Sequence, residues 1–77
     1  MIIKYEGKDY ELGEITNIGD LEKAIKNKRI TSLLTEGHLR WNTSYFINGV
    51  FYSCDELKNM NLDNIDKMTI ILQLAGG

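Results

Sequence analysis

The residues of this chain best suited to chemistry are the last four, Leu74-Ala75-Gly76-Gly77, which directly follow an alternating apolar segment. A carboxylate at Gly77 is ionised at neutral pH and is a poor electrophile, so an ATP-using partner must first convert it to a mixed anhydride. Two glycines suit that reaction, because a backbone without Cβ leaves the approach of a nucleophile open. The ending therefore predicts an acyl group that another protein activates.

The same residues have the length to enter a partner's active site, since four extended residues span about 13 Å. We expect residues 1–73 to form one folded domain and residues 74–77 to form an extended, flexible tail. A partner would read the tail, whose activated end is Gly76 and Gly77, through Leu72, Gln73, Leu74 and Ala75.

The rest of the chain offers no set of catalytic side chains. His38 is the only histidine and Cys54 the only thiol, and they lie on different segments. Their spacing is typical neither of a nucleophile with its base nor of a zinc site. Asp55 and Glu56 disfavour the thiolate that a reactive cysteine needs, so we interpret Cys54 as an edge or loop cysteine and His38 as a surface residue. We expect no enzyme activity, no bound cofactor and no metal in the chain itself.

Length and composition are typical of a small soluble domain. The 77 residues allow one domain at most, and a net charge of -2 argues against nucleic-acid binding, which usually needs a basic face. No apolar stretch approaches the ~20 residues of a membrane span, and no secretory signal is expected. A single cysteine fits a reducing compartment. We therefore expect a cytoplasmic monomer with no nucleic-acid or membrane partner.

The elements that must position the ending begin with a hairpin and a helix. Alternating residues on either side of the polar segment 6–9 predict a hairpin over residues 1–16. Asn17 is a good N-cap, with Asp20 three residues on. Apolar residues at helical spacing follow, and the helix is expected to end near Asn27-Lys28.

The middle of the chain is harder to interpret. Residues 29–44 fit neither period, and we expect a short strand near 30–34, a turn at Glu36-Gly37, and core positions for Trp41 and Tyr45. Aromatic and β-branched residues then flank Asn48-Gly49, which is the strongest short-range signal for a hairpin.

The last third predicts a loop with a helical turn over residues 54–64 and a final strand over residues 67–74. In that strand Met68, Ile70 and Leu72 share one face, and Thr69 and Ile71 share the other. Strands arranged around one helix are typical of a two-layer α+β domain. We expect the first and last strands, the most apolar ones, to lie together in the middle of the sheet.

This order of elements, with its terminal glycines, resembles the ubiquitin-like β-grasp family over almost the whole chain. Gly7-Lys8 resembles the glycine-lysine pair of ubiquitin's first turn, and residues 45–49 its strand-turn segment ending in Ala-Gly. Asn61-Leu62 is similar to the Asn-Ile before ubiquitin's last strand, and residues 68–77 match the ending residue by residue. The resemblance implies a β-grasp fold: a mixed four- to five-stranded sheet with one main helix packed across one face.

The chain also departs from ubiquitin. Its first turn is shorter, and the segment between the helix and the third strand is longer and lacks the proline pair. Gln73 and Ala75 stand where ubiquitin has arginines. The Ala-Gly-Gly ending and the Asn48-Gly49 pair are also similar to prokaryotic sulfur carriers of the same fold, the small subunit of molybdopterin synthase and the thiamine carrier.

The resemblance implies a ubiquitin-like protein modifier. Its Gly77 carboxylate would be adenylated by an activating enzyme, carried as a thioester and conjugated to target proteins through an isopeptide bond. A conjugating enzyme and a deconjugating peptidase are further expected partners. The alternative is a sulfur carrier, in which Gly77 becomes a thiocarboxylate for the thiolation of a cofactor or a tRNA base. A third hypothesis is an interaction module whose glycines are incidental.

A surface for partners is expected on the sheet face away from the helix. Strand parity places Phe46, Thr69 and Ile71 there, and with Gly49 they coincide with ubiquitin's main apolar binding patch. We name these four residues the outer patch. Exposed neighbouring Phe and Ile side chains are unusual in a monomer unless they bind a partner. The alternative is that residues 29–44 fold over the outer patch as additional core.

Overall fold

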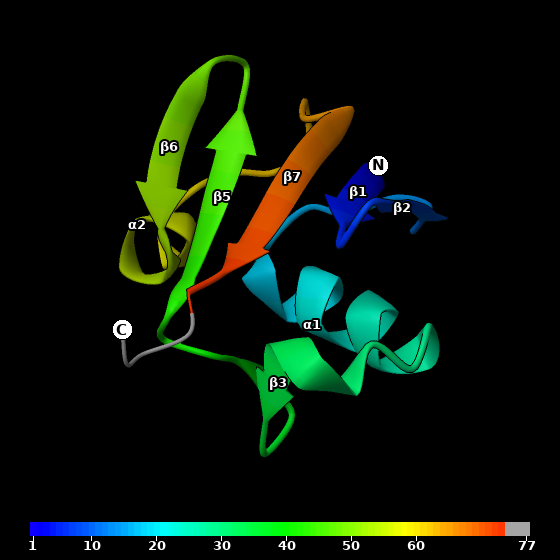
Figure 1. Ribbon diagram of the computed structural model, residues 1–77. Coiled ribbons are helices and arrows are strands. Elements are labelled where there is room, and N and C mark those ends of the chain that lie inside the picture. Colours follow the sequence, from blue (N-terminus) through cyan, green and yellow to red (C-terminus); the bar gives the residue numbers. More distant parts are fainter. Residues whose placement is uncertain (74–77) are drawn as a thin grey trace.

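The structure, a computed structural model, describes residues 1–73 of the chain. Within these residues a mixed sheet of five strands and one main helix form two layers, as expected for an α+β domain (Figure 1). The strand order is β2-β1-β7-β5-β6, and a separate pair is formed by β3 and β4. The elements are β1 (Ile2–Tyr5), β2 (Lys8–Glu11), α1 (Ile18–Asn27), the 3₁₀ turn η1 (Thr31–Leu33), β3 (Leu34–Thr35), β4 (His38–Leu39), β5 (Thr43–Ile47), β6 (Val50–Ser53), α2 (Cys54–Lys58) and β7 (Lys67–Leu72).

The first hairpin has a tighter turn than the sequence predicts. Tyr5 lies opposite Lys8, so only Glu6 and Gly7 remain between β1 and β2. Both have positive φ, 50° and 77°, a backbone twist that matches two antiparallel strands. A hairpin is confirmed, with Ile3 and Tyr5 buried on one face of β1, but its second strand ends at Glu11 and not near residue 16.

Helix α1 begins and ends where its capping residues predict. The Asn17 side chain accepts a hydrogen bond from the Asp20 backbone N–H at 2.9 Å. The Asp20 carboxylate accepts from the backbone N–H of Thr16 at 3.0 Å, one residue before the position that a standard capping box uses. Leu21 and Ile25 are fully buried in the core.

Strand β7 lies in the centre of the sheet. It pairs in parallel with β1, where Ile3 lies opposite Met68, and antiparallel with β5, where Tyr45 lies opposite Ile70. The inward-facing side chains of these three strands belong to the same buried cluster as the apolar face of α1. The predicted central position of the first and last strands is confirmed.

Residues 29–44 differ from the expected single strand. A 3₁₀ turn occupies residues 31–33, and the strand begins only at Leu34 and lasts two residues. The predicted turn at Glu36-Gly37 is confirmed and joins β3 to β4. Leu33 and Leu39 are buried in the core. A 3₁₀ turn and two-residue strands contain too few residues to show a period, so the sequence pattern could not resolve them.

Helix α2 is the predicted helical turn. Its N-cap, Ser53, accepts from the Glu56 N–H at 3.1 Å and donates its own N–H to the Glu56 carboxylate at 2.9 Å, a complete capping box. Cys54 is the first residue of this helix and is buried, so its assignment to an edge or a loop is wrong. Neither α1 nor α2, nor any other helix within residues 1–73, is long and apolar enough to cross a membrane.

Candidate functional site

The outer patch is exposed on the sheet face away from α1. Phe46 lies opposite Thr69 in the β5–β7 ladder, and Ile71 lies two residues further along β7. Phe46 is 38% exposed and Ile71 40% exposed. Phe46, Gly49 and Thr69 also line a shallow pocket of about 280 Å³. The structure therefore brings the four predicted residues onto one surface.

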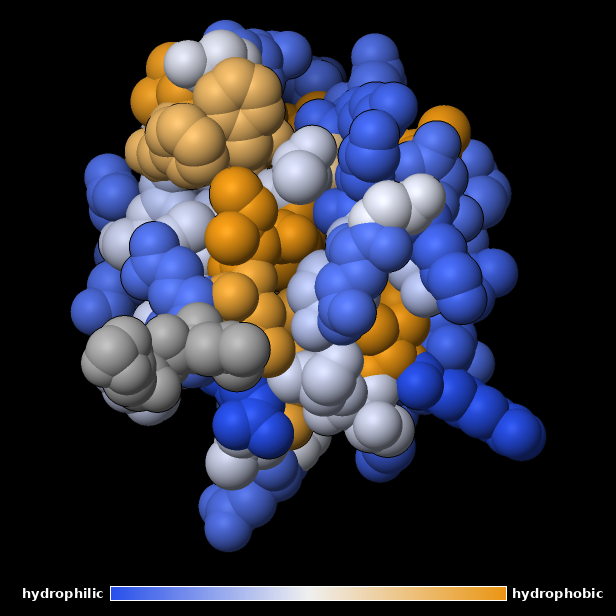
Figure 2. All heavy atoms as spheres, viewed as in Figure 1, coloured by the Kyte–Doolittle hydropathy of each residue, from blue (hydrophilic) through white to orange (hydrophobic). Residues whose placement is uncertain are grey.

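The alternative in which residues 29–44 cover the outer patch is wrong. The apolar residues that this segment buries, Leu33 and Leu39 among them, belong to the core on the other side of the sheet, with α1. Figure 2 shows apolar side chains gathered over the β5–β6 end of the sheet and along β7. Residues 29–44 therefore leave the outer patch exposed.

The structure adds Phe51 to this surface. Its ring centroid lies 4.7 Å from that of Phe46, with the ring planes at 50°, an arrangement favoured by aromatic quadrupoles. Phe51 is 61% exposed. The Asn48-Gly49 turn has two residues, so it fixes Phe46 opposite Phe51. That register was available from the sequence, and it would have identified Phe51.

The end of β7 is the second feature of the site, because the predicted tail begins there. Leu72 lies opposite Thr43, and Gln73 follows the strand as an exposed residue. Leu74, Ala75, Gly76 and Gly77 lie outside the described residues. The structure therefore describes two of the predicted tail-recognition residues, Leu72 and Gln73.

Asn42 holds Gln73 with two hydrogen bonds. The Gln73 backbone N–H donates to the Asn42 carbonyl at 2.8 Å, and the Asn42 side-chain amide donates to the Gln73 carbonyl at 2.7 Å. The first bond joins β5 and β7 one residue beyond their ladder, and the second is supplied by a side chain. Together they hold the Gln73 backbone against the residue that precedes β5. The contact joins residues 31 positions apart, and no local sequence signal predicts it.

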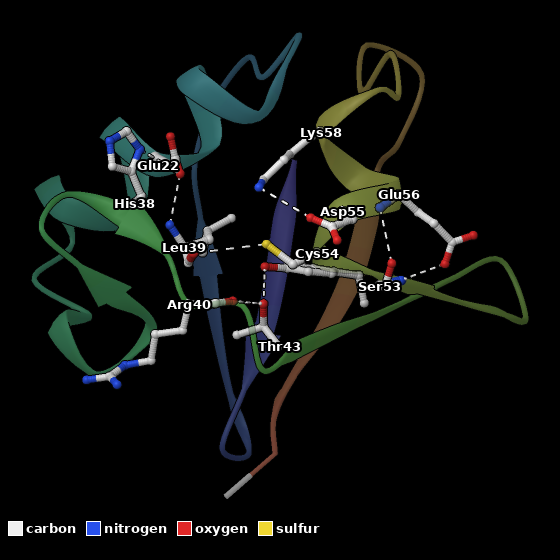
Figure 3. Close-up of polar contacts among 11 residues, drawn as sticks. Glu22, His38, Leu39, Arg40, Thr43, Ser53, Cys54, Asp55, Glu56 and Lys58 are labelled. Carbon is white, nitrogen blue, oxygen red and sulfur yellow. Dashed lines mark hydrogen bonds and ion pairs between the residues drawn. The ribbon is translucent and has the colours of Figure 1, made fainter. Parts of the chain in front are cut away.

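The turn that carries Asn42 is itself fixed to the body. The Arg40 backbone N–H donates to the Leu33 carbonyl at 3.0 Å, and its Nε donates to the Ser32 carbonyl at 2.8 Å. The Thr43 hydroxyl donates to the Arg40 carbonyl at 2.7 Å (Figure 3). The turn from Arg40 to Thr43 is therefore bonded to residues 32 and 33 through Arg40, and its two ends are joined by the Thr43 hydroxyl.

Tyr45 completes this network from inside the core, as its predicted core position requires. Its hydroxyl lies 2.6 Å from the Thr43 hydroxyl. Since the Thr43 proton is given to Arg40, the Tyr45 hydroxyl is the donor in this pair. Burial raises the pKa of the Tyr45 phenol well above its usual value of 10.0, and the hydrogen bond with Thr43 opposes the shift.

Trp41 lies in the same turn, and its predicted core position is wrong. Its side chain is 82% exposed. The hydrogen bonds of Arg40 and Asn42 fix the backbone on either side of it, while Leu39 and Tyr45 occupy the core positions nearby. The apolar character of Trp41 favoured burial in the sequence, but the polar anchors of the turn decide its position.

His38 lies at the surface, as predicted. Its Nδ1 atom is 3.4 Å from the Glu22 carboxylate, which also accepts from the Leu39 N–H at 2.8 Å (Figure 3). Cys54 is on a different element and is buried. Within residues 1–73 the structure contains no group of three or more His, Cys, Asp or Glu side chains placed to hold a metal ion.

Comparison of the chain with protein-family models, with curated proteins and with solved structures found no match.

Proposed function

We propose that the protein is a ubiquitin-like modifier of β-grasp fold, whose Gly77 carboxylate is activated by an adenylating enzyme and conjugated to target proteins. One observation carries the proposal. The central strand of the sheet leads directly into Gln73, an exposed residue whose backbone Asn42 fixes, and the next residues in the chain are Leu74-Ala75-Gly76-Gly77.

The architecture supports the β-grasp part of the proposal. The sheet order is β2-β1-β7-β5-β6, the neighbouring strands β1 and β7 pair in parallel, and α1 packs across one face. The outer patch and Phe51 lie on the opposite face and would serve as a binding surface for enzymes or receptors. Large aromatic side chains are enriched among the residues that dominate binding energy at interfaces.

The proposed chemistry divides between the chain and its partners. A Gly77 carboxylate oxygen attacks the α-phosphorus of ATP, which releases pyrophosphate and leaves an acyl-adenylate. An enzyme cysteine thiolate displaces AMP and forms a thioester, and the amine of a target lysine then displaces the thiol. The chain supplies the acyl group and the surface that is recognised. ATP and the catalytic side chains belong to the partners.

The test is ATP–pyrophosphate exchange with the adenylating enzyme of the protein's own organism. The 77-residue chain should support exchange that saturates with its concentration. A chain shortened by Gly76 and Gly77 is the matched control and should support none. Equal exchange with both chains, or none with the full chain, would overturn the proposal.

The second candidate is a sulfur carrier, which the uncharged residues Gln73 and Ala75 favour because they stand where ubiquitin has arginines. Mass spectrometry separates the two. No Lys or Arg follows Lys67, so trypsin would leave residues 68–77 on the lysine of a conjugated target. A sulfur carrier would instead show an intact mass increased by the difference between one sulfur and one oxygen atom.

The third hypothesis, an interaction module with incidental glycines, makes a different prediction. Removal of Gly76 and Gly77 would then leave both partner binding and the cellular phenotype unchanged. Loss of either on this deletion argues for a function of the C-terminal glycines.

A further inference from the structure

We propose that Trp41 is the anchor by which the adenylating enzyme holds the folded body of this protein while it takes up the C-terminal residues. The indole would enter an apolar pocket of that enzyme beside the entrance of its active site. The inference rests on the proposed function, and it assigns a binding residue that lies outside the outer patch.

The Trp41 side chain is highly exposed. Among the large apolar side chains within residues 1–73, Trp41 is the most exposed. Its indole offers a large apolar area and one N–H donor. Tryptophan is also among the residue types enriched at the positions that dominate protein–protein binding energy. A pocket that accepts it would be apolar and would contain an acceptor for the indole N–H.

Hydrogen bonds on both sides of Trp41 hold the backbone that carries it. Trp41 lies between Arg40, which donates to two carbonyls of residues 32 and 33, and Asn42, which makes two hydrogen bonds to Gln73. Its backbone is thus held before any partner arrives. A side chain presented on a fixed backbone loses less conformational freedom on binding.

The position of Trp41 next to Asn42 indicates which partner would contact it. Trp41 directly precedes the residue that holds Gln73, and the four residues after Gln73 reach at most about 13 Å. An enzyme whose active site contains Gly77 must therefore cover the surface around Asn42, where Trp41 projects. A second copy of the chain has no such geometric reason to contact Trp41.

Within the outer patch, Phe46 and Gly49 lie toward the other end of strand β5, whereas Ile71 lies opposite Ser44, nearer to Trp41. Phe46 and Trp41 are five residues apart, which corresponds to at most about 16 Å even for a fully extended chain. The two surfaces are consequently separable by mutation. Val50 provides a matched control, because it is also an exposed apolar residue, and it lies at the β5–β6 turn, opposite the inward-facing Ile47.

The experiment measures KM and kcat for the chain in ATP–pyrophosphate exchange. Trp41→Ala should raise KM about 10- to 30-fold with little change in kcat, the effect of losing an interface anchor. Trp41→Phe should recover part of the loss, and Val50→Ala should have the KM of the wild type. The urea midpoint of Trp41→Ala should be unchanged, because the side chain is mostly exposed. A wild-type KM for Trp41→Ala, or an equal increase for Val50→Ala, would overturn the inference.

A second measurement separates this inference from the proposed function. Binding of the same variants to the adenylating enzyme is titrated without ATP, using chains that lack Gly76 and Gly77. Weaker binding by Trp41→Ala supports the anchor even if the full chain proves not to be adenylated, which would overturn only the proposed function. Equal binding by wild type and Trp41→Ala, or no binding by either, would overturn the anchor.

Discussion

At the scale of single residues, Asn42 connects the turn before β5 to the end of β7. Both of its bonds to Gln73 involve the Gln73 backbone, and one is donated by the Asn42 side chain. Replacing the Asn42 side chain removes one bond and leaves the other. Replacing the Gln73 side chain removes neither, so the two positions form a matched pair for mutation.

Asn42→Ala should lower the free energy of unfolding by about 1 kcal/mol, the usual contribution of one hydrogen bond. Gln73→Ala should change it by less than about 0.5 kcal/mol, as exposed substitutions usually do. Urea unfolding of the three proteins measures both effects. If Gln73→Ala were destabilised as much as Asn42→Ala, the side chain of Gln73, and not only its backbone, would contribute to stability at the end of β7.

The buried phenol of Tyr45 should make the free energy of unfolding depend on pH. Burial raises the pKa of its phenol above 10.0 in the folded chain, so the unfolded chain releases this proton first as the pH rises. The unfolding free energy should therefore be constant with respect to this group below about pH 9 and should fall above about pH 10. Burial also raises the pKa of Tyr5, so part of the decline will remain without Tyr45.

Tyr45→Phe tests this expectation. The variant should lose about 1 kcal/mol at neutral pH with its hydrogen bond to Thr43. Its unfolding free energy should also fall less steeply than that of the wild type above about pH 10. Urea unfolding at a series of pH values measures the slope, and identical slopes for the two proteins would contradict the assignment.

At the scale of elements, the sequence predicted the helix start and the hairpin turn that depend on neighbouring residues alone. Asn17 with Asp20 placed the start of α1, and Asn48-Gly49 placed the β5–β6 hairpin and its register. Residues 29–44 were not predictable in the same way. Their elements are too short to show a period, and the position of Trp41 depends on hydrogen bonds made to η1 and to the end of β7. The sequence predicted that the outer patch lies on one face of the sheet, but it did not predict the contact between Asn42 and Gln73.

The N-cap of α1 offers a test at this scale. Asn17→Ala should cost about 1 kcal/mol, because the Asp20 N–H loses its acceptor. Asn17→Asp keeps an acceptor at the same position and should be close to the wild type. Thermal unfolding followed by circular dichroism compares the three proteins. Equal stability of Asn17→Ala and the wild type would mean that the cap contributes nothing to α1.

At the scale of the whole molecule, the residues near the two ends of β5 have different proposed roles. Phe46, Gly49 and Phe51 lie toward the β5–β6 turn, and Trp41, Asn42 and Gln73 lie at the opposite end. Thr69 and Ile71 of the outer patch lie between them along β7. We expect recognition of the patch and reaction at the C-terminus to be separable, with the folded body serving both.

The most direct test of the account is the intact mass of the 77-residue chain after incubation with ATP and its adenylating enzyme. The chain should acquire AMP, or become joined to an enzyme cysteine, through the Gly77 carboxylate. The chain shortened by Gly76 and Gly77 should be recovered unmodified. Recovery of the full chain unmodified, or equal modification of both chains, would contradict the claim that Gly77 is the reacting group.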